Sequence, residues 1–164
     1  MSQPEAVLFD KDGTILPFAP FWTTWTRVFR DALAEAVEVD LSGGGLLDWP
    51  ANTRTASHGA SLDVATMGDV RVRVAAMLRD GGVAAADARR IVTAASDTAD
   101  AVAAAMPVTA HEGFVEVVDA LAAAGVRLGV VTGDDEGRAV RQVAALALAD
   151  RLPVVVGGDC GLPG

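Results

Sequence analysis

Cysteine and lysine are nearly missing from the sequence, because among its 164 residues Cys160 is the only cysteine and Lys11 the only lysine. A single cysteine cannot form a disulfide within the chain, which favours a reducing cytoplasm as its location. Residues 1–5 lack the basic and apolar regions of a secretory signal. No apolar run is long enough to span a bilayer, since charged residues interrupt the alanine-rich stretches. We therefore expect a cytoplasmic protein without a membrane partner.

Basic residues are also few, since 13 Lys and Arg against 22 Asp and Glu give a formal net charge of −9. This balance argues against a broad binding surface for nucleic acid or for an anionic membrane. Hydrophobic residues make up 51% and charged residues 21%, as is typical of a folded globular chain. The length suffices for one domain with a small insertion. The composition therefore predicts a folded domain that does not bind nucleic acid.

Hydrophobic periodicity predicts short buried strands that are separated by helices. A purely helical stretch follows the first strand, and the other strands come after Pro107. Strands separated by helices indicate a parallel sheet with right-handed crossovers, so the predicted fold class is α/β. Thr109 and Glu112 have the spacing of a capping box, and Asp134 or Asp135 can cap the helix after the second strand. The expected strands cover 7–9, 126–132 and 153–156, the expected helices cover 21–37, 67–79, 84–106 and 114–125, and a loop is expected over 48–59.

Two polar motifs stand where predicted strands end. Asp10–Thr14 follows the first strand, and Thr132–Asp135 follows the second. In a parallel α/β sheet, ligands bind outside the carboxyl ends of the strands. Side chains alternate along an extended chain, so Asp10 and Asp12 should face one site while Lys11 faces away. Two neighbouring carboxylates repel each other unless a cation lies between them, and hard oxygen donors suit Mg²⁺.

The other residues of these motifs suit an anion. Gly13 would let the chain turn sharply and bring backbone N–H groups close to a phosphate. Thr132 adds a hydroxyl group, and Gly133 adds a backbone N–H that no side chain shields. The two motifs together predict a site for a metal ion and a phosphate group.

Three segments carry a resemblance to a known family. AVLFDKDGTIL (6–16) resembles the first signature of the haloacid dehalogenase-like (HAD-like) hydrolases, and LGVVTGD (128–134) resembles their second. VVVGGDCGLP (154–163) resembles the stretch after the third strand in phosphoglycolate phosphatases of that superfamily. The resemblance implies a HAD-like Rossmannoid parallel sheet with a helical C1-type cap insertion. The implied core covers 1–17 and 107–164, and the implied cap covers 18–106.

The resemblance also implies a mechanism. Asp10 would be the nucleophile that attacks a small phosphate monoester, with phosphoglycolate as the best single guess, and forms an aspartyl-phosphate. Asp12 would be the general acid and base. Mg²⁺ would be bound by the Asp10 carboxylate and the Asp12 backbone carbonyl. Gly13, Thr132 and Gly133 would bind the phosphate. The expected partner is therefore a small phosphorylated metabolite.

The chain departs from the family pattern in two motifs. The third motif of the family supplies a lysine and the fourth supplies acids for the metal, and neither motif is found in this sequence. We therefore expect a truncated chain without the C-terminal strands, whose strand at 7–9 is an exposed edge that another chain covers, as in a homo-oligomer. Arg138 or Arg141 could replace the lysine, although a solvated arginine is more common. Two alternatives stay open, a catalytically impaired HAD-fold fragment that acts as a binding module and a HAD phosphomutase.

Overall fold

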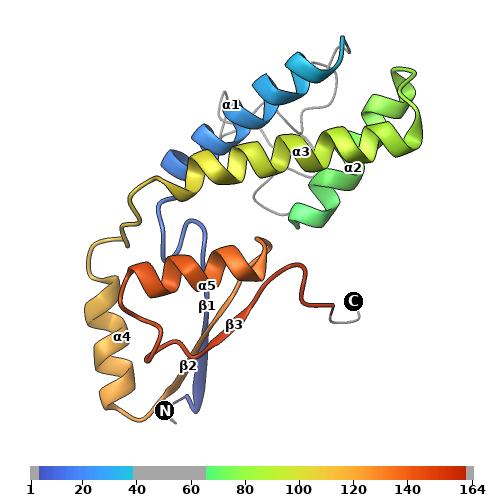
Figure 1. The fold of residues 1–164 in the computed structure, drawn as a ribbon. Coiled ribbons are helices and arrows are strands. Elements are labelled where there is room, and N and C mark those ends of the chain that lie inside the picture. Colours follow the sequence, from blue (N-terminus) through green and yellow to red (C-terminus); the bar gives the residue numbers. More distant parts are fainter. Residues whose placement is uncertain (1–3, 39–65, 162–164) are drawn as a thin grey trace, which may run out of the picture. The chain divides into compact units, whose positions relative to one another are not determined.

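The computed structural model describes residues 4–38 and 66–161, and the loop expected over 48–59 lies outside them. The chain divides into two compact units (Figure 1). Met1–Phe18 and Pro107–Gly164 form one unit, which contains the three strands and is called the sheet unit below. Ala19–Met106 forms the other, which is called the helical unit.

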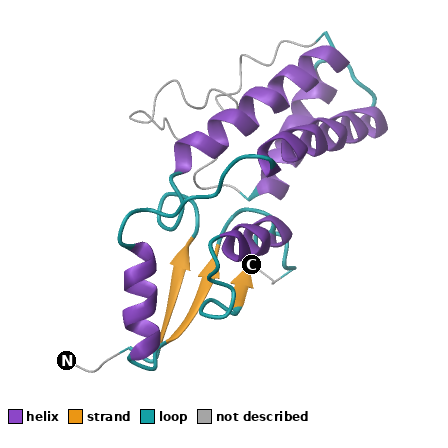
Figure 2. Ribbon diagram, turned by 60° about the vertical axis from the view of Figure 1, so that its left-hand side comes forward, coloured by secondary structure: helices purple, strands orange, loops and turns teal. Residues whose placement is uncertain are grey.

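The sheet unit is built on three parallel strands. β1 (Ala6–Asp10) pairs with β2 (Arg127–Val131), and β2 pairs with β3 (Val154–Val156), so the order in space is β1-β2-β3. This arrangement confirms the predicted α/β class with a parallel sheet. Because the strands run in the same direction, their carboxyl ends meet at one edge of the sheet (Figure 2). Asp10 lies opposite Val131 there, which places the two polar motifs next to each other.

Helices α4 (Phe114–Ala123) and α5 (Glu136–Ala145) contribute to the core on one face of the sheet. Successive side chains of each strand point to opposite faces of the sheet, so every second strand residue faces these helices. Phe9 packs edge-on against Phe114, with ring centroids 5.1 Å apart. The core of the sheet unit consists of Ile15, Leu16, Phe114, Val118, Val126, Leu128, Val130, Val143, Leu148 and Leu152.

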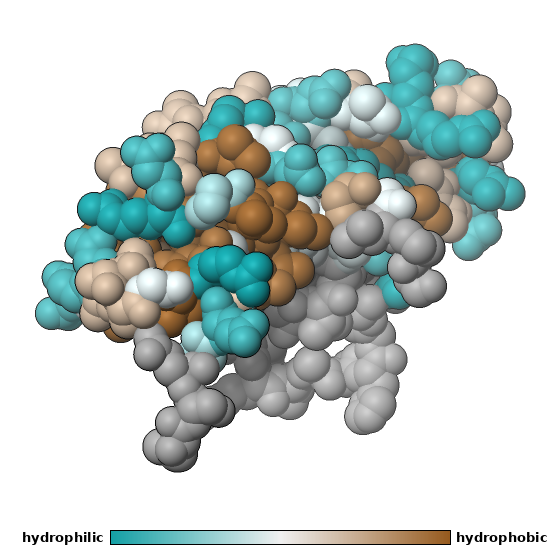
Figure 3. Space-filling view, turned by 90° about the horizontal axis from the view of Figure 1, so that it is seen from below, coloured by the Kyte–Doolittle hydropathy of each residue, from teal (hydrophilic) through white to brown (hydrophobic). Residues whose placement is uncertain are grey.

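The other face of the sheet leaves apolar side chains at the surface. Leu8, Val131 and Val154 are 62%, 43% and 51% exposed. Leu8 and Val154 flank Gly129, where a Cβ atom would lie 2.9 Å from Leu8 Cδ2 and 3.2 Å from Val154 Cβ. The missing side chain of Gly129 therefore lets these two residues close over the middle of the sheet. Figure 3 views the molecule from below the view of Figure 1 and shows apolar residues in brown near the centre of that surface.

The start of α4 differs from the prediction. The helix begins at Phe114, after Gly113 in a left-handed conformation with φ of 79°, and no side chain caps it. The capping box expected at Thr109 and Glu112 is therefore wrong. Both residues precede the helix, because the chain is first held by a hydrogen bond from His111 N to Ile15 O at 2.9 Å. Asp135 occupies the N-cap position of α5, again without a side-chain capping bond.

The helical unit contains α2 (Met67–Asp80), α3 (Ala85–Ala104) and all of α1 (Phe18–Ala36) except its first residue. α1 begins at Phe18, three residues before the expected start at 21. Pro20 does not prevent this, because backbone N–H groups in the first turn of a helix have no partner within the helix. Trp22, Trp25, Phe29 and Leu33 of this helix are buried, and Trp25 stacks on Phe29 with centroids 4.7 Å apart. Trp25 Nε1 donates a hydrogen bond of 2.6 Å to Asp100 Oδ1, which links α1 to α3. Among the described residues, no helix is both long and apolar enough to cross a membrane.

Candidate active site

The loop after β1 is closed by three backbone hydrogen bonds. Ile15 N and Leu16 N both donate to Lys11 O at 2.9 Å, and Gly13 N donates to Leu16 O at 2.7 Å. Gly13 has φ of 88°, a left-handed conformation that a side chain would disfavour, so glycine is suited to this turn. These bonds use the carbonyl oxygens of Lys11 and Leu16 and not that of Asp12.

Lys11 contacts both acids of the first motif through its two nitrogens. Its backbone N–H donates to Asp10 Oδ1 at 2.8 Å, and its Nζ lies 2.8 Å from Asp12 Oδ1 and 2.8 Å from Asp12 Oδ2. The expectation that Lys11 faces away from the acids is therefore wrong. The alternation of an extended strand ends with β1 at Asp10, and the flexible four-carbon stem of lysine lets its ammonium group return to Asp12.

Asp10 lies at the carboxyl end of β1 in a partly desolvated position. Burial raises the pKa of Asp10, the hydrogen bond from Lys11 N opposes this, and the nearby Asp12 carboxylate adds to the rise. A cation bound at Asp10 would relieve the last of these effects. No group of three or more acidic, histidine or cysteine side chains gathers for a metal in the described residues. Mg²⁺ often takes only one or two carboxylates and completes its shell with water and phosphate, so the Asp10 carboxylate is a donor of the kind that such an ion takes.

The second motif reaches the first through Thr132. This buried residue follows β2, and its Oγ1 lies 3.5 Å from Asp12 Oδ2. The same oxygen accepts a hydrogen bond of 3.1 Å from Asp134 N. Gly133, between them, is exposed. The structure thus brings Thr132 and Asp12 together, as the spacing of the two motifs predicts.

A buried polar cluster, which the two sequence motifs do not predict, lies next to Asp12. Lys11 Nζ is 3.0 Å from Asp134 Oδ2 and 2.8 Å from Gln142 Oε1. Arg138 Nη1 is 3.0 Å from Asp134 Oδ1. Burial raises the pKa of Asp134, while the charges of Lys11 and Arg138 oppose the rise. The four side chains join the loops after β1 and β2 to α5.

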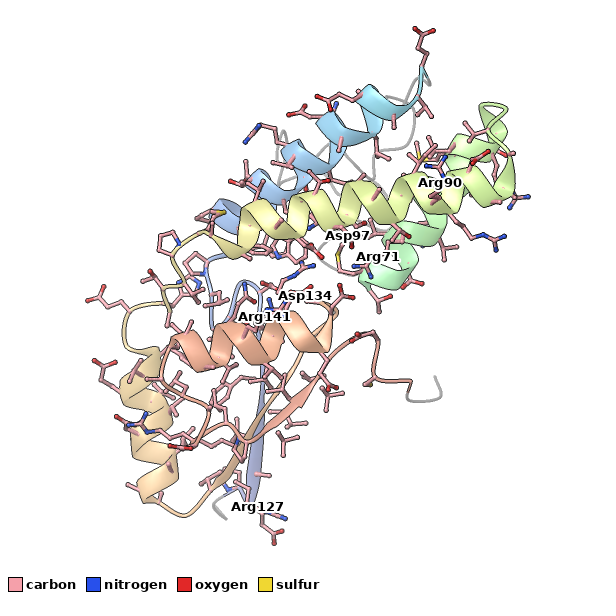
Figure 4. All side chains as sticks on the ribbon, viewed as in Figure 1. Arg71, Arg90, Asp97, Arg127, Asp134 and Arg141 are labelled. Atoms are coloured by element: carbon pink, nitrogen blue, oxygen red, sulfur yellow. The ribbon has the colours of Figure 1, made fainter. Side chains whose placement is uncertain are left out.

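Arg138 differs from its expected role as a solvated arginine or a phosphate ligand, because it is buried and paired with Asp134. A signal for the cluster was present in the sequence, since Asp134, Arg138 and Gln142 are spaced by four residues, the spacing of side chains that face the same way along a helix. Arg141, which Figure 4 labels on α5 near Asp134, is exposed.

The loop after β3 holds the first turn of α5 in place. Gly158 N donates to Asp134 O at 2.8 Å, and Glu136 N donates to Asp159 Oδ1 at 2.7 Å. Gly157 approaches so closely that a Cβ atom there would lie 2.3 Å from Glu136 N. The described residues of the segment that resembles the third-strand region of phosphoglycolate phosphatases therefore support the second motif.

Comparison with known proteins identifies the family. A family model described as haloacid dehalogenase-like hydrolase matches residues 4–160. The chain therefore belongs to the haloacid dehalogenase-like hydrolases, which confirms the resemblance in its first and second motifs. It is 37% identical to a phosphoglycolate phosphatase of Rhodospirillum rubrum over 160 residues, which cover 95% of this chain. The match spans 59% of the length of that relative.

Solved structures show the same fold. A predicted phosphoglycolate phosphatase from Haemophilus somnus superimposes with a TM-score of 0.68 at 15% identity, over 99% of this chain and 66% of that one. The 2-haloacid dehalogenase of Pseudomonas syringae pv. tomato superimposes with a TM-score of 0.59 at 22% identity, over 96% of this chain and 65% of that one. At these identities the two structures show the fold and do not identify the reaction.

Proposed function

We propose that this chain carries the nucleophile and the general acid of a phosphatase that hydrolyses a small phosphate monoester. The observation that carries the proposal is the position of Asp10 and Asp12 at the end of β1, with Thr132 Oγ1 3.5 Å from Asp12. Membership of the HAD-like hydrolases supports it.

In the first half of the reaction, an Asp10 carboxylate oxygen would attack the phosphorus atom in line with the ester bond. The ester P–O bond breaks, and Asp12 gives its proton to the leaving alkoxide. The product bound to the chain is an aspartyl-phosphate. The Thr132 hydroxyl and the backbone N–H of Gly133 would hold the transferring oxygens. The N–H of Gly13, which the sequence suggested for this role, instead donates to Leu16 O at 2.7 Å, so Gly13 contributes to the site through its turn.

In the second half, Asp12 would take a proton from a water molecule, which attacks the phosphorus atom. The bond between phosphorus and the Asp10 oxygen breaks, so inorganic phosphate leaves and the Asp10 carboxylate is restored. Mg²⁺ held by the Asp10 carboxylate and the Asp12 carbonyl would supply the positive charge that lets the carboxylate approach an anionic ester.

Phosphoglycolate is the substrate that we favour. The relative that is 37% identical is named a phosphoglycolate phosphatase, and it supports a small acidic phosphate ester for this chain. The expected products are an alcohol and inorganic phosphate. Nucleic acid is not an expected partner, because the chain has a net charge of −9.

Phosphate release tests the proposal. We would measure it with phosphoglycolate and with p-nitrophenyl phosphate, in Mg²⁺ and in EDTA. Asp10→Asn removes the nucleophile, so release should fall to the background seen in EDTA. Asp150→Asn makes the same chemical change at an exposed residue and should keep the activity.

The outcomes separate a phosphatase from a binding module. Release that requires Mg²⁺ and is lost in Asp10→Asn supports the phosphatase. No release from either ester, or equal release by Asp10→Asn, contradicts it. Binding of orthophosphate without turnover would then favour the alternative of a chain that binds phosphate but does not hydrolyse esters.

A further inference from the structure

Lys11 is unusual for a lysine because its side chain is only 1% exposed. Burial of an ammonium group costs free energy unless other polar groups replace the lost water. Lys11 is also the only lysine of the chain. A probe of lysine side chains therefore reports on this one residue.

Three different side chains replace the water around the ammonium group. Lys11 Nζ lies 2.8 Å from Asp12 Oδ1, 3.0 Å from Asp134 Oδ2 and 2.8 Å from Gln142 Oε1. A lysine ammonium has three donors and no acceptor, so these three groups can use all its hydrogen atoms. Asp134 lies in the loop after β2 and Gln142 lies on α5, so two of the three partners hold the ammonium group independently of Asp12.

The ammonium group of Lys11 contacts both oxygens of the Asp12 carboxylate. Nζ is 2.8 Å from Oδ1 and 2.8 Å from Oδ2, and Thr132 Oγ1 lies 3.5 Å from Oδ2. The Asp12 side chain is 12% exposed and that of Lys11 is 1% exposed. The acid therefore reaches solvent while the lysine stays behind it, so in this arrangement Lys11 acts on a bound ester through Asp12.

We propose that Lys11 is a positioning residue, which Asp134 and Gln142 hold in place so that its ammonium group directs the Asp12 carboxylate at the end of β1. The inference rests on the proposed function, in which Asp12 gives a proton to the leaving group. Small errors in the direction of a reacting group slow its reaction strongly. Loss of Lys11 should therefore harm proton donation more than phosphate binding.

Two esters separate these effects. p-Nitrophenolate leaves as a stabilised anion, whereas the alkoxide of phosphoglycolate needs a proton. For Lys11→Met, kcat/KM toward phosphoglycolate should fall about a hundredfold, the smaller end of what general acid catalysis contributes. The value toward p-nitrophenyl phosphate should change far less, and Asp12→Asn should show the same preference.

The control is Arg127→Met, which removes an exposed cation at the start of β2, at the opposite end of the strand from the site (Figure 4). It should change neither value. An equal loss on both esters in Lys11→Met would overturn the positioning role, because a general loss of structure or of phosphate affinity does not distinguish leaving groups.

A second measurement does not need turnover. Labelling with ¹⁵N-lysine gives one side-chain ammonium signal in the NMR spectrum of the whole chain. Burial and hydrogen bonding should slow its proton exchange enough to make it visible at neutral pH. Asp12→Asn and Gln142→Leu should each shift it, and Arg127→Met should not. Rapid exchange in the natural sequence, as in a solvated lysine, would overturn the inference.

The two measurements also separate this inference from the proposed function. If both esters are hydrolysed and Lys11→Met slows them equally, the phosphatase stands and the positioning role fails. If neither ester is hydrolysed but the ammonium signal is protected and responds to Asp12→Asn, the phosphatase fails while the contact that fixes the Asp12 carboxylate stands.

Discussion

Arg138 and Asp134 form a buried ion pair, with Nη1 3.0 Å from Oδ1, at the start of α5. Arg138 also lies 3.5 Å from Asp135 Oδ2 through its Nη2. Asp134 is shared, because its second carboxylate oxygen contacts Lys11. Burial raises the pKa of Asp134, and the charges of Lys11 and Arg138 stabilise its ionised form in the folded chain.

We predict that Arg138→Met destabilises the sheet unit. The variant leaves Asp134 buried with one of its two cations, so unfolding should become easier by about 3 kcal/mol, the smaller end of the range for breaking a buried pair. Urea unfolding followed by circular dichroism measures it. Arg141→Met removes an exposed arginine from the same helix and should cost less than about 0.5 kcal/mol. Equal effects of the two substitutions would contradict the prediction.

A second prediction concerns the close approach of the loop after β3 to α5. A Cβ atom at Gly157 would lie 2.3 Å from Glu136 N and 2.5 Å from Glu136 Cα, so Gly157→Ala must push the loop from the helix. The expected loss of unfolding free energy is about 1–3 kcal/mol, as for other overpacked positions. The backbone amides of β2 should exchange their hydrogens faster in this variant than in the natural chain.

The matched control for this prediction is Gly137→Ala, which should change the free energy of unfolding in the opposite direction. Gly137 lies within α5, and the nearest atom to a Cβ there is Arg141 Nη1 at 3.5 Å, an ordinary contact. Gly137→Ala should stabilise the chain by up to about 1 kcal/mol, because alanine favours helix more than glycine does. Stabilisation by both substitutions would show that the loop is not as tightly packed as the structure indicates.

A third prediction concerns pH and the start of α2. Thr66 and Asp69 form a capping box, in which Asp69 N donates to Thr66 Oγ1 and Asp69 Oδ2 accepts from Thr66. These hydrogen bonds lower the pKa of Asp69 from its ordinary value of 3.8. A lowered folded-state pKa contributes stability above pH 3.8, and this contribution is lost as the pH falls through the folded-state pKa.

The natural chain should therefore be more stable than Asp69→Asn at pH 7, and the difference should shrink as the pH falls below 3.8. Trp22 and Trp25 are buried in α1, so their fluorescence during unfolding reports on the helical unit. Thr66→Val removes the hydroxyl partner and should reduce the same pH dependence. A difference that stays constant from neutral to acid pH would count against the capping box.

Hydrophobic periodicity was sufficient to predict the fold of the sheet unit, because its strands are short, apolar and separated by helices. The expected strand at 126–132 is β2 at Arg127–Val131, and the one at 153–156 is β3 at Val154–Val156. The capping box at Thr109 failed because the spacing of two residues does not say where a helix begins. Gly113, in a left-handed conformation, sets that point.

The site was only partly predictable for a different reason. Motif order placed Asp12 near Thr132, since both follow neighbouring parallel strands. The buried cluster could not be derived from the alternation of a strand, because Lys11 lies one residue beyond β1 and its long side chain bends back. The four-residue spacing of Asp134, Arg138 and Gln142 indicates that these three side chains lie close together. Sequence spacing does not show that Lys11, from the loop after β1, joins them.

A last prediction concerns association of the chain. β1 is one of the two outer strands of the sheet in the described part of the chain, and Leu8 on it is 62% exposed on the sheet face beside Gly129. Exposed apolar edges favour pairing with another strand. We propose that a second copy covers this edge, so light scattering after size exclusion should give a mass above that of one chain. Leu8→Lys should restore the monomer because a lysine on an edge strand opposes pairing with another strand, whereas Val72→Lys, at a residue that is 70% exposed on α2, should not. A monomer at every concentration of the natural chain would refute this interface, and it would leave the phosphatase proposal untouched because Asp10 and Asp12 need no second copy to meet.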